Sequence, residues 1–157
     1  MENKQGHEND FYNIGAMGCA QSIAFGISLQ EKEKKVFVFD GDGAVLMQMG
    51  AFATIGHYAP EGFHHIIFDN QAHDSTGGQP TCSDTVKFNE IAVASGYKAG
   101  RIVETKEELE KVFPLFKKEK GPSLLVVKVK KGARGNLGRP VNLPVEYKKD
   151  FMKSVLD

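Results

Sequence analysis

The feature that most constrains the fold is an apolar run that ends in two closely spaced glycines, in the segment KVFVFDGDG at residues 35–43. Side chains alternate between the two faces of a strand, so four apolar residues in a row predict an interior strand of a parallel sheet. An Asp-Gly pair between apolar runs is also typical of β-hairpins. The apolar residues of 44–58, however, recur at spacings of three and four, which predicts a helix. We therefore expect a strand, a tight turn and a helix.

Strands and helices alternate along most of the chain. The other predicted elements are helices at 15–30, at 88–97, from 105 and from 144, and strands at 64–69, 100–104 and 123–129. Pro114 is expected to end or kink the helix that starts at 105. This alternation predicts an α/β fold, a parallel sheet with helices on both faces. The sequence does not define the order of the strands.

Length and charge narrow the class of protein. The 157 residues are enough for one domain, expected over 11–157, after a flexible lead-in at 1–10. The formal net charge is zero, which argues against nucleic acid or an anionic membrane as the main partner. No apolar run approaches the roughly 20 residues that span a bilayer, and the polar start has no signal-peptide core. We therefore expect a cytoplasmic protein.

The turn at 41–43 has the chemistry of a diphosphate site. Gly41 and Gly43 have no side chains, so a phosphate can approach their N–H groups, and the helix that follows adds its positive end. Asp42 beside a phosphate requires a cation, and Mg²⁺ prefers such oxygen ligands. Asn70 ends the next predicted strand, 28 positions after Asp42. A strand–helix–strand unit of that length brings the two turns side by side, so Asn70 and a backbone carbonyl just beyond it are candidate ligands.

These residues match a known family. The GDG turn, the strand-terminal Asn70 and the segment GAMG at 15–18 together resemble the cofactor signature of thiamine diphosphate enzymes. The segments DGDGAVLMQMGAFATIG, DNQAHDSTGGQPT and NLGRP resemble the C-terminal half of phosphonopyruvate decarboxylase, over about residues 11–152. Within the family, the segment HDSTGGQPT resembles the corresponding segment of the phosphonopyruvate and sulfopyruvate decarboxylases. The resemblance therefore implies a thiamine diphosphate-binding fold.

The resemblance also implies roles for individual residues. The implied metal ligands are Asp42, Asn70 and the carbonyl of Ala72. The implied diphosphate contacts are Gly41, Gly43 and Ala44. The carbonyl of Gly15 would accept a hydrogen bond from the 4′-amino group of the cofactor, and Met17 would hold the bent shape of the cofactor. The family more often has Asn at the position of Asp69.

One essential group of the family is expected on another chain or domain. In these enzymes a glutamate of the pyrimidine-binding domain contacts N1′ of the cofactor. This chain is too short to contain that domain, so the resemblance implies half of an active site. We expect a partner that carries the glutamate, in a homo- or hetero-oligomer. A natural split subunit and a fragment of a longer enzyme both remain open.

The loop after Asn70 provides the candidate catalytic residues. His73, Asp74 and Ser75 follow the metal ligand, and they are predicted to orient an anionic substrate or to move a proton. Asp and Ser also bond local backbone in ordinary turns, which is the alternative. Arg134 and Arg139 are candidates for binding a phosphonate, because arginine pairs well with such oxygens. An exposed basic loop explains these two arginines equally well.

The predicted function is the thiamine diphosphate- and Mg²⁺-binding half of a 2-oxo acid decarboxylase. The expected substrate is phosphonopyruvate, which gives phosphonoacetaldehyde and CO₂. One alternative is the beta subunit of a sulfopyruvate decarboxylase. The other is a non-catalytic module that binds a diphosphate.

Overall fold

The computed structural model describes residues 9–133, 135–136, 138, 140 and 142–156. They form two compact units, one over residues 18–132 and one that combines the residues up to 17 with those from 133 onward. Each unit is described by itself. Most of the predicted lead-in at 1–10 lies outside the described residues, and the single domain expected over 11–157 stays a prediction.

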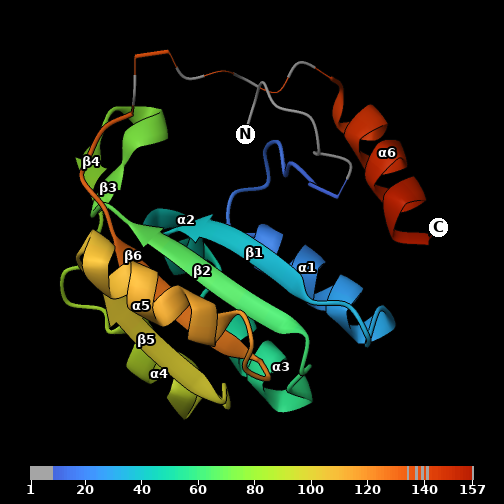
Figure 1. Cartoon of the computed structure of the whole chain (residues 1–157). Helices are drawn as coiled ribbons and strands as arrows, with labels where there is room; N and C mark the ends of the chain where they lie inside the picture. Colours follow the sequence, from blue (N-terminus) through green and yellow to red (C-terminus); the bar gives the residue numbers. More distant parts are fainter. Residues whose placement is uncertain (1–8, 134, 137, 139, 141, 157) are drawn as a thin grey trace. The chain divides into compact units, whose positions relative to one another are not determined.

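The larger unit is built on a parallel sheet of four strands (Figure 1). The order across the sheet is β1 (Val36–Gly41), β2 (Phe63–Asp69), β6 (Ser123–Lys128) and β5 (Ala99–Val103). All three neighbouring pairs are parallel. The predicted parallel sheet is therefore confirmed.

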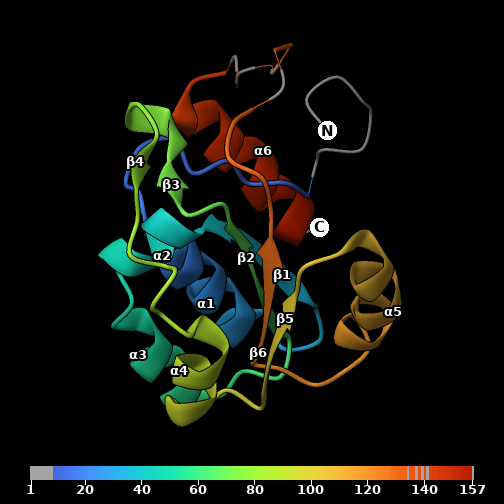
Figure 2. The same cartoon turned by 90° about the vertical axis from the view of Figure 1, so that its left-hand side faces the viewer.

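Helices cover both faces of this sheet, as predicted. Figure 2 shows the sheet from its edge, with α5 (Lys106–Phe116) alone on one face. The opposite face carries α1 (Ala20–Gln30), α3 (Ala51–Tyr58) and α4 (Phe88–Ala94). A short helix, α2 (Asp42–Met47), begins where β1 ends.

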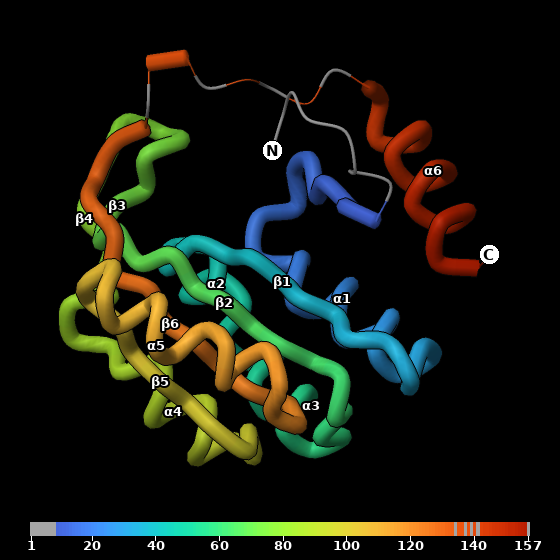
Figure 3. Tube along the Cα trace, in the orientation of Figure 1, coloured from blue at the N-terminus to red at the C-terminus, as the bar shows by residue number. Residues whose placement is uncertain are grey.

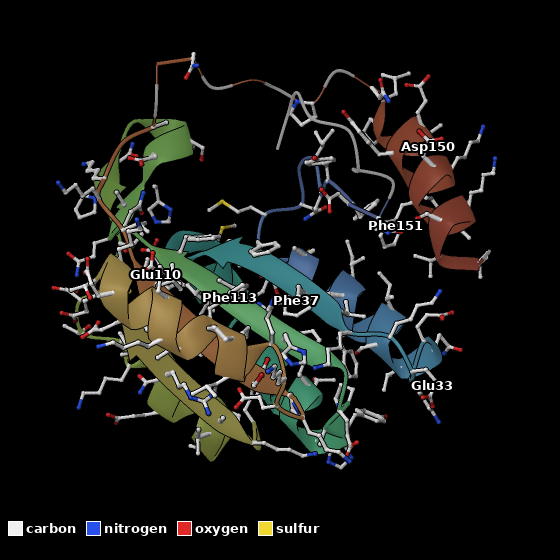
Figure 4. All side chains as sticks on the ribbon, viewed as in Figure 1. Glu33, Phe37, Glu110, Phe113, Asp150 and Phe151 are labelled. Atoms are coloured by element: carbon white, nitrogen blue, oxygen red, sulfur yellow. The ribbon has the colours of Figure 1, made fainter. Side chains whose placement is uncertain are left out.

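Each covered face buries its own apolar cluster. On the face with three helices, the cluster includes the fully buried Phe52, Phe63 and Leu124. On the other face, Phe113 of α5 and Phe37 of β1 pack against a cluster that contains Phe116 (Figure 4). Burial of a large apolar side chain stabilises a fold by about 1.5–3 kcal/mol. The two clusters therefore hold the helices against the two faces of the sheet.

Two of the predicted helices differ from the structure in their boundaries. The helix expected at 15–30 begins only at Ala20, because Gly15, Ala16 and Gly18 have positive φ angles of 77°, 46° and 90°. The helix expected at 44–58 is two helices, α2 and α3, separated at residues 48–50.

Pro114 does not end the helix that was expected from residue 105, since α5 continues to Phe116. A proline this close to the end of a helix removes only one late hydrogen bond, and the buried Phe116 holds the last turn against the sheet.

The smaller unit contains α6 (Pro144–Leu156), which begins where the sequence predicted. Phe11 packs against Phe151 with ring centroids 5.6 Å apart, and Tyr12 packs against Tyr147 at 5.2 Å. Figure 4 labels Phe151 on α6, and Figure 3 traces the path of the chain. Two aromatic pairs thus join the N-terminal segment to the last helix. Among the described residues, the helices are too short or too polar to cross a membrane.

Candidate functional site

The two predicted ligand turns lie at the same edge of the sheet. Strands β1 and β2 run parallel in register, with Gly41 opposite Phe68. Asp42 therefore leaves β1 beside the point where Asn70 leaves β2. Asp42 opens α2 and is only 1% exposed. The arrangement expected from the 28-residue spacing is present in the structure.

Asp42 is held by a residue that the sequence did not single out. The hydroxyl of Thr81 donates a hydrogen bond to the Asp42 carboxylate at 2.5 Å. The neighbouring Gly41 is exposed, and no atom lies within 4 Å of the place where its β-carbon would be. An anion can approach the backbone at Gly41, as the GDG pattern predicts.

Asn70 begins a tight turn that fixes its side chain. Its Oδ1 accepts a hydrogen bond from the N–H of Ala72 at 3.0 Å, and its Nδ2 donates to Asp74 at 2.7 Å. Gln71 between them has a φ of 57°, a left-handed conformation. An amide oxygen has two lone pairs, so Oδ1 can also bind a metal ion.

The predicted catalytic loop is a small β-hairpin. Its strands are β3 (Ala72–His73) and β4 (Gln79–Pro80), with a 3-10 turn, η1 (Asp74–Thr76), between them. His73 pairs with Gln79, and the His73 carbonyl accepts from the N–H of Gly78 at 2.9 Å. Gly77 and Gly78 have φ angles of 114° and 74°, which explains the two glycines.

His73 lies directly against the glycine turn. A β-carbon on Gly43 would be 2.6 Å from two atoms of the His73 ring. The missing side chain of Gly43 therefore makes room for the imidazole of His73, and its contact with a phosphate stays a prediction. This places His73 at the end of the sheet that carries the GDG turn.

Asp74 and Ser75 have different surroundings. The Oδ2 atom of Asp74 accepts from Asn70 and from the N–H of Gly132 at 2.9 Å, and Lys131 donates to the carbonyl of Gly78. Asp74 thus joins the metal-ligand turn to the chain after β6. Ser75 is exposed on η1. Geometry favours a positioning role for Asp74 and leaves the role of Ser75 a prediction.

The other predicted cofactor residues are spread over both units. Ala44 is half-buried in α2, and a β-carbon on Gly18 would lie 2.7 Å from its carbonyl oxygen. Gly15 and Met17 belong to the smaller unit, where the turn has left-handed backbone and Met17 is 40% exposed. Arg134 and Arg139, the candidate substrate residues, lie outside the described residues.

The donor set of the predicted metal site fits Mg²⁺ only if other ligands complete it. Within the described part of the chain, no group of three or more His, Cys, Asp and Glu side chains is placed to hold a metal ion. The predicted site supplies one carboxylate (Asp42), one amide oxygen (Asn70) and one carbonyl (Ala72). Oxygen ligands of this kind, completed by a diphosphate and water, suit a hard divalent cation.

A buried polar pair lies directly before the GDG turn. His65 Nε2 is 3.1 Å from Oδ2 of Asp40, and the two side chains are 0% and 4% exposed. The Asp40 carboxylate also acts on a third buried residue, Tyr97. Burial raises the pKa of the Tyr97 hydroxyl, and the negative charge of Asp40 raises it further by a smaller amount. The sequence showed two histidines at this strand without indicating which one is paired. His64 instead lies near the carbonyls of Gly62 and Glu119.

Three further polar residues support the two turns and were missed in the sequence. Thr81 and Ser83 follow the hairpin, and Lys128 ends β6. Ser83 donates to Oδ1 of Asp69 at 2.8 Å, and Lys128 donates to its Oδ2 at 2.5 Å. The sequence did contain a signal for Lys128. The family more often has Asn at position 69, and an Asp buried there needs a cationic partner.

Comparison with known proteins places this chain in a family. Residues 2–127 match the family model described as thiamine pyrophosphate enzyme, C-terminal TPP binding domain. Thiamine pyrophosphate is another name for thiamine diphosphate. A solved structure of a candidate thiamin diphosphate-dependent enzyme from Mycobacterium smegmatis has a TM-score of 0.60 at 21% identity, over 75% of this chain and 23% of that one. It shows the same fold.

Curated relatives are more similar in sequence. A phosphonopyruvate decarboxylase of Streptomyces viridochromogenes is 38% identical over 92% of this chain and 36% of its own length. A sulfopyruvate decarboxylase subunit beta of Methanococcus maripaludis is 36% identical over 94% of this chain and 78% of its own length. The chain thus spans about a third of the first relative and most of the second. This chain belongs to the thiamine pyrophosphate enzyme family, and it contains the C-terminal, cofactor-binding domain of that family.

Proposed function

We propose that this chain holds the diphosphate of thiamine diphosphate through Mg²⁺ and forms half of a 2-oxo acid decarboxylase. The proposed substrate is phosphonopyruvate, and the products are phosphonoacetaldehyde and CO₂. The observation that carries the proposal is the meeting of Asp42, Asn70 and His73 at one end of the sheet. Metal ligands and a titratable ring at the same place are what a cofactor-dependent decarboxylase needs.

The metal-binding part rests on two adjacent turns. The carboxylate of Asp42, the amide oxygen of Asn70 and the carbonyl of Ala72 hold the cation on the protein side. Gly41 leaves the backbone open to the diphosphate. Asp42 and the phosphates are both negatively charged, so a cation held by these residues would be needed between them.

The hairpin provides the chemistry on the substrate side. When bound, thiamine diphosphate supplies the electron sink that decarboxylation of a 2-oxo acid needs. The carbon atom that loses CO₂ gains a proton in the product aldehyde. His73 is the proposed source of that proton, because its ring lies against Gly43 beside the cofactor turn. Asp74 holds the hairpin to Asn70 and Gly132, so that His73 keeps its position.

The proposed enzyme needs a second domain or subunit. The glutamate that contacts N1′ of the cofactor is assigned to a pyrimidine-binding partner. One of the curated relatives is itself described as a beta subunit. Assembly with such a partner, as a homo- or hetero-oligomer, is therefore part of the proposal.

A second candidate is the beta subunit of a sulfopyruvate decarboxylase. This chain covers 78% of the Methanococcus beta subunit but only 36% of the Streptomyces phosphonopyruvate enzyme. The 36% identity with that beta subunit is what supports this candidate. Both substrates are 2-oxo acids with a second anionic group, so the same site chemistry accommodates either.

The decisive experiment measures CO₂ release from phosphonopyruvate, sulfopyruvate and pyruvate, with and without a pyrimidine-domain partner. We expect phosphonopyruvate to be the best substrate of the assembled enzyme, and the chain alone to be inactive. Faster turnover of sulfopyruvate would select the second candidate. Cofactor binding without turnover of any 2-oxo acid, in the presence of the partner, would indicate a non-catalytic diphosphate-binding module.

A further inference from the structure

A chain of polar contacts joins the ends of β1 and β2 behind the proposed metal ligands. Thr81 donates to the carboxylate of Asp42 at 2.5 Å. The oxygen of Thr81 in turn accepts from the N–H of Ser83 at 3.4 Å, and the two hydroxyl oxygens are 3.0 Å apart. Ser83 then donates to Asp69 at 2.8 Å. The residue after the hairpin thus links the turn of β1 to the turn of β2.

Asp69 is the end point of this chain of contacts and is fully enclosed. Its side chain is 0% exposed and 2.5 Å from the ammonium of Lys128, which is 29% exposed. The same carboxylate accepts from the N–H of Gln71 at 3.2 Å. Asp69 therefore bonds to the turn that contains Asn70, to Ser83 and to β6.

A second contact ties the same segment to the β2 turn. The N–H of Thr81 donates to the carbonyl of Gln71 at 3.1 Å. Thr81 thus contacts both turns, through its hydroxyl on one side and its backbone on the other. Such a bridge fixes the separation between the oxygen atoms of Asp42 and Asn70.

We propose that Thr81 and Ser83 are positioning residues for the metal ligands, anchored by the Asp69–Lys128 ion pair. This inference rests on the proposed function, since it concerns the same Mg²⁺ site. The hydroxyl of Thr81 orients the buried Asp42 carboxylate, and Ser83 with Asp69 holds the Asn70 turn in register with it. Outer partners of this kind typically change metal affinity by about 10- to 100-fold when they are removed.

The test uses the full chain with thiamine diphosphate at fixed concentration and Mg²⁺ as the titrated probe. The thermal midpoint is followed, and the Mg²⁺ concentration for half of the shift is compared between variants. Thr81→Val keeps the shape of the side chain but removes the hydroxyl, and we expect about a 10-fold or larger increase in that concentration. Thr81→Ser should restore the wild-type value. Thr85→Val is the matched control, because Thr85 is exposed and its hydroxyl donates to the carbonyl of Cys82.

The outcomes separate the two proposals. A wild-type chain whose stability does not respond to Mg²⁺ and cofactor together overturns the proposed function and this inference with it. A normal wild-type response with an unchanged Thr81→Val overturns the inference alone. If Thr81→Val does not fold, Ser83→Ala decides. It should also weaken the Mg²⁺ response, and an unchanged response would overturn the positioning role.

Discussion

The imidazole of His73 lies so close to Gly43 that a β-carbon at position 43 would come within 2.6 Å of two ring atoms. Gly43 is in α2, where alanine is normally the better residue by up to about 1 kcal/mol. We expect Gly43→Ala to displace the ring and to lower turnover of the assembled enzyme at least 10-fold. It should not bring the usual gain in stability.

The matched control for this substitution is Gly26→Ala in α1, where no atom lies within 4 Å of the added carbon. Gly26→Ala should raise the free energy of unfolding by about 0.5–1 kcal/mol and leave turnover unchanged. Combining Gly43→Ala with His73→Ala should cost no more turnover than His73→Ala alone. Additive losses would show that Gly43 acts independently of the ring.

Asp42 carries the clearest prediction about the metal. Asp42→Ala should abolish the Mg²⁺-dependent thermal protection by thiamine diphosphate, because it removes the only charged ligand of the proposed set. Asp84→Ala, which changes an exposed carboxylate after the hairpin, should leave the protection intact. Equal protection of wild type and Asp42→Ala, measured by thermal unfolding, would remove the metal site from the proposal.

Substitutions of Asp74 and of His73 should have different effects on the Mg²⁺ requirement. Asp74 holds the amide of Asn70, so Asp74→Ala should raise the Mg²⁺ requirement and also lower turnover. His73→Ala should lower turnover by roughly 10²-fold, the scale of a lost acid–base group, at an unchanged Mg²⁺ requirement. A Mg²⁺ titration of activity and of thermal stability distinguishes the two. Asp84→Ala serves as the control, because it removes an exposed carboxylate after the hairpin.

The capping box of α5 predicts a local effect on stability. Thr105 accepts from the N–H of Glu108, and Glu108 accepts from the N–H groups of Thr105 and Glu104. Thr105→Ala should lower the free energy of unfolding by about 1 kcal/mol in urea denaturation, and Thr105→Ser should lower it much less. Loss of activity by Thr105→Ala at a temperature where it is fully folded would contradict a purely structural role.

The same cap predicts a dependence on pH. The backbone N–H groups of Glu104 and Thr105 lower the pKa of Glu108 below its ordinary value. The stabilisation is therefore present above the unfolded pKa and is lost as the pH falls through the folded pKa. The difference in stability between wild type and Glu108→Gln should be seen near neutral pH and vanish in acid. A difference that grows toward acid pH would have the wrong sign.

Association with a partner should depend on the apolar surface near the cofactor turn. Met47 at the end of α2 is 56% exposed. Met47→Asp should weaken assembly with the pyrimidine-domain partner, as measured by light scattering of the mixture. Leu115→Asp changes a side chain on α5 that is even more exposed, at 65%, and is expected to leave assembly unchanged. If both or neither weaken assembly, α2 is not the contact surface.

Much of this architecture is predictable because it depends on local patterns. The apolar run at β1 and the helical period after it define a strand–turn–helix unit whatever the rest of the chain does. The spacing of Asp42 and Asn70 then places two turns at one edge. The break between α2 and α3 at residues 48–50 was not predictable from the spacing of apolar residues, because those on either side continue the same helical spacing.

The polar residues that support the candidate site could not be predicted, because their contacts depend on the order of the strands in the sheet. Lys128 meets Asp69 since β6 pairs with β2, with those two residues opposite each other in the register. Nothing in the local sequence around Lys128 indicates that neighbour. Thr81 and Ser83 were likewise hidden, because their partners lie on two different strands that only the folded sheet brings together.

The pairing of β6 with β2 also has a consequence for the order of folding. Asp69 and Lys128 are 59 residues apart in the chain, whereas the His65–Asp40 contact between β1 and β2 spans 25 residues. Closing the longer loop costs more chain entropy, so contacts between distant segments form late. The β1–β2 unit can therefore form before the ion pair that anchors the Asn70 turn. Pulsed hydrogen exchange should show protection in β1 and β2 ahead of β6, so that the turns bearing the proposed metal ligands form before the ion pair that anchors one of them.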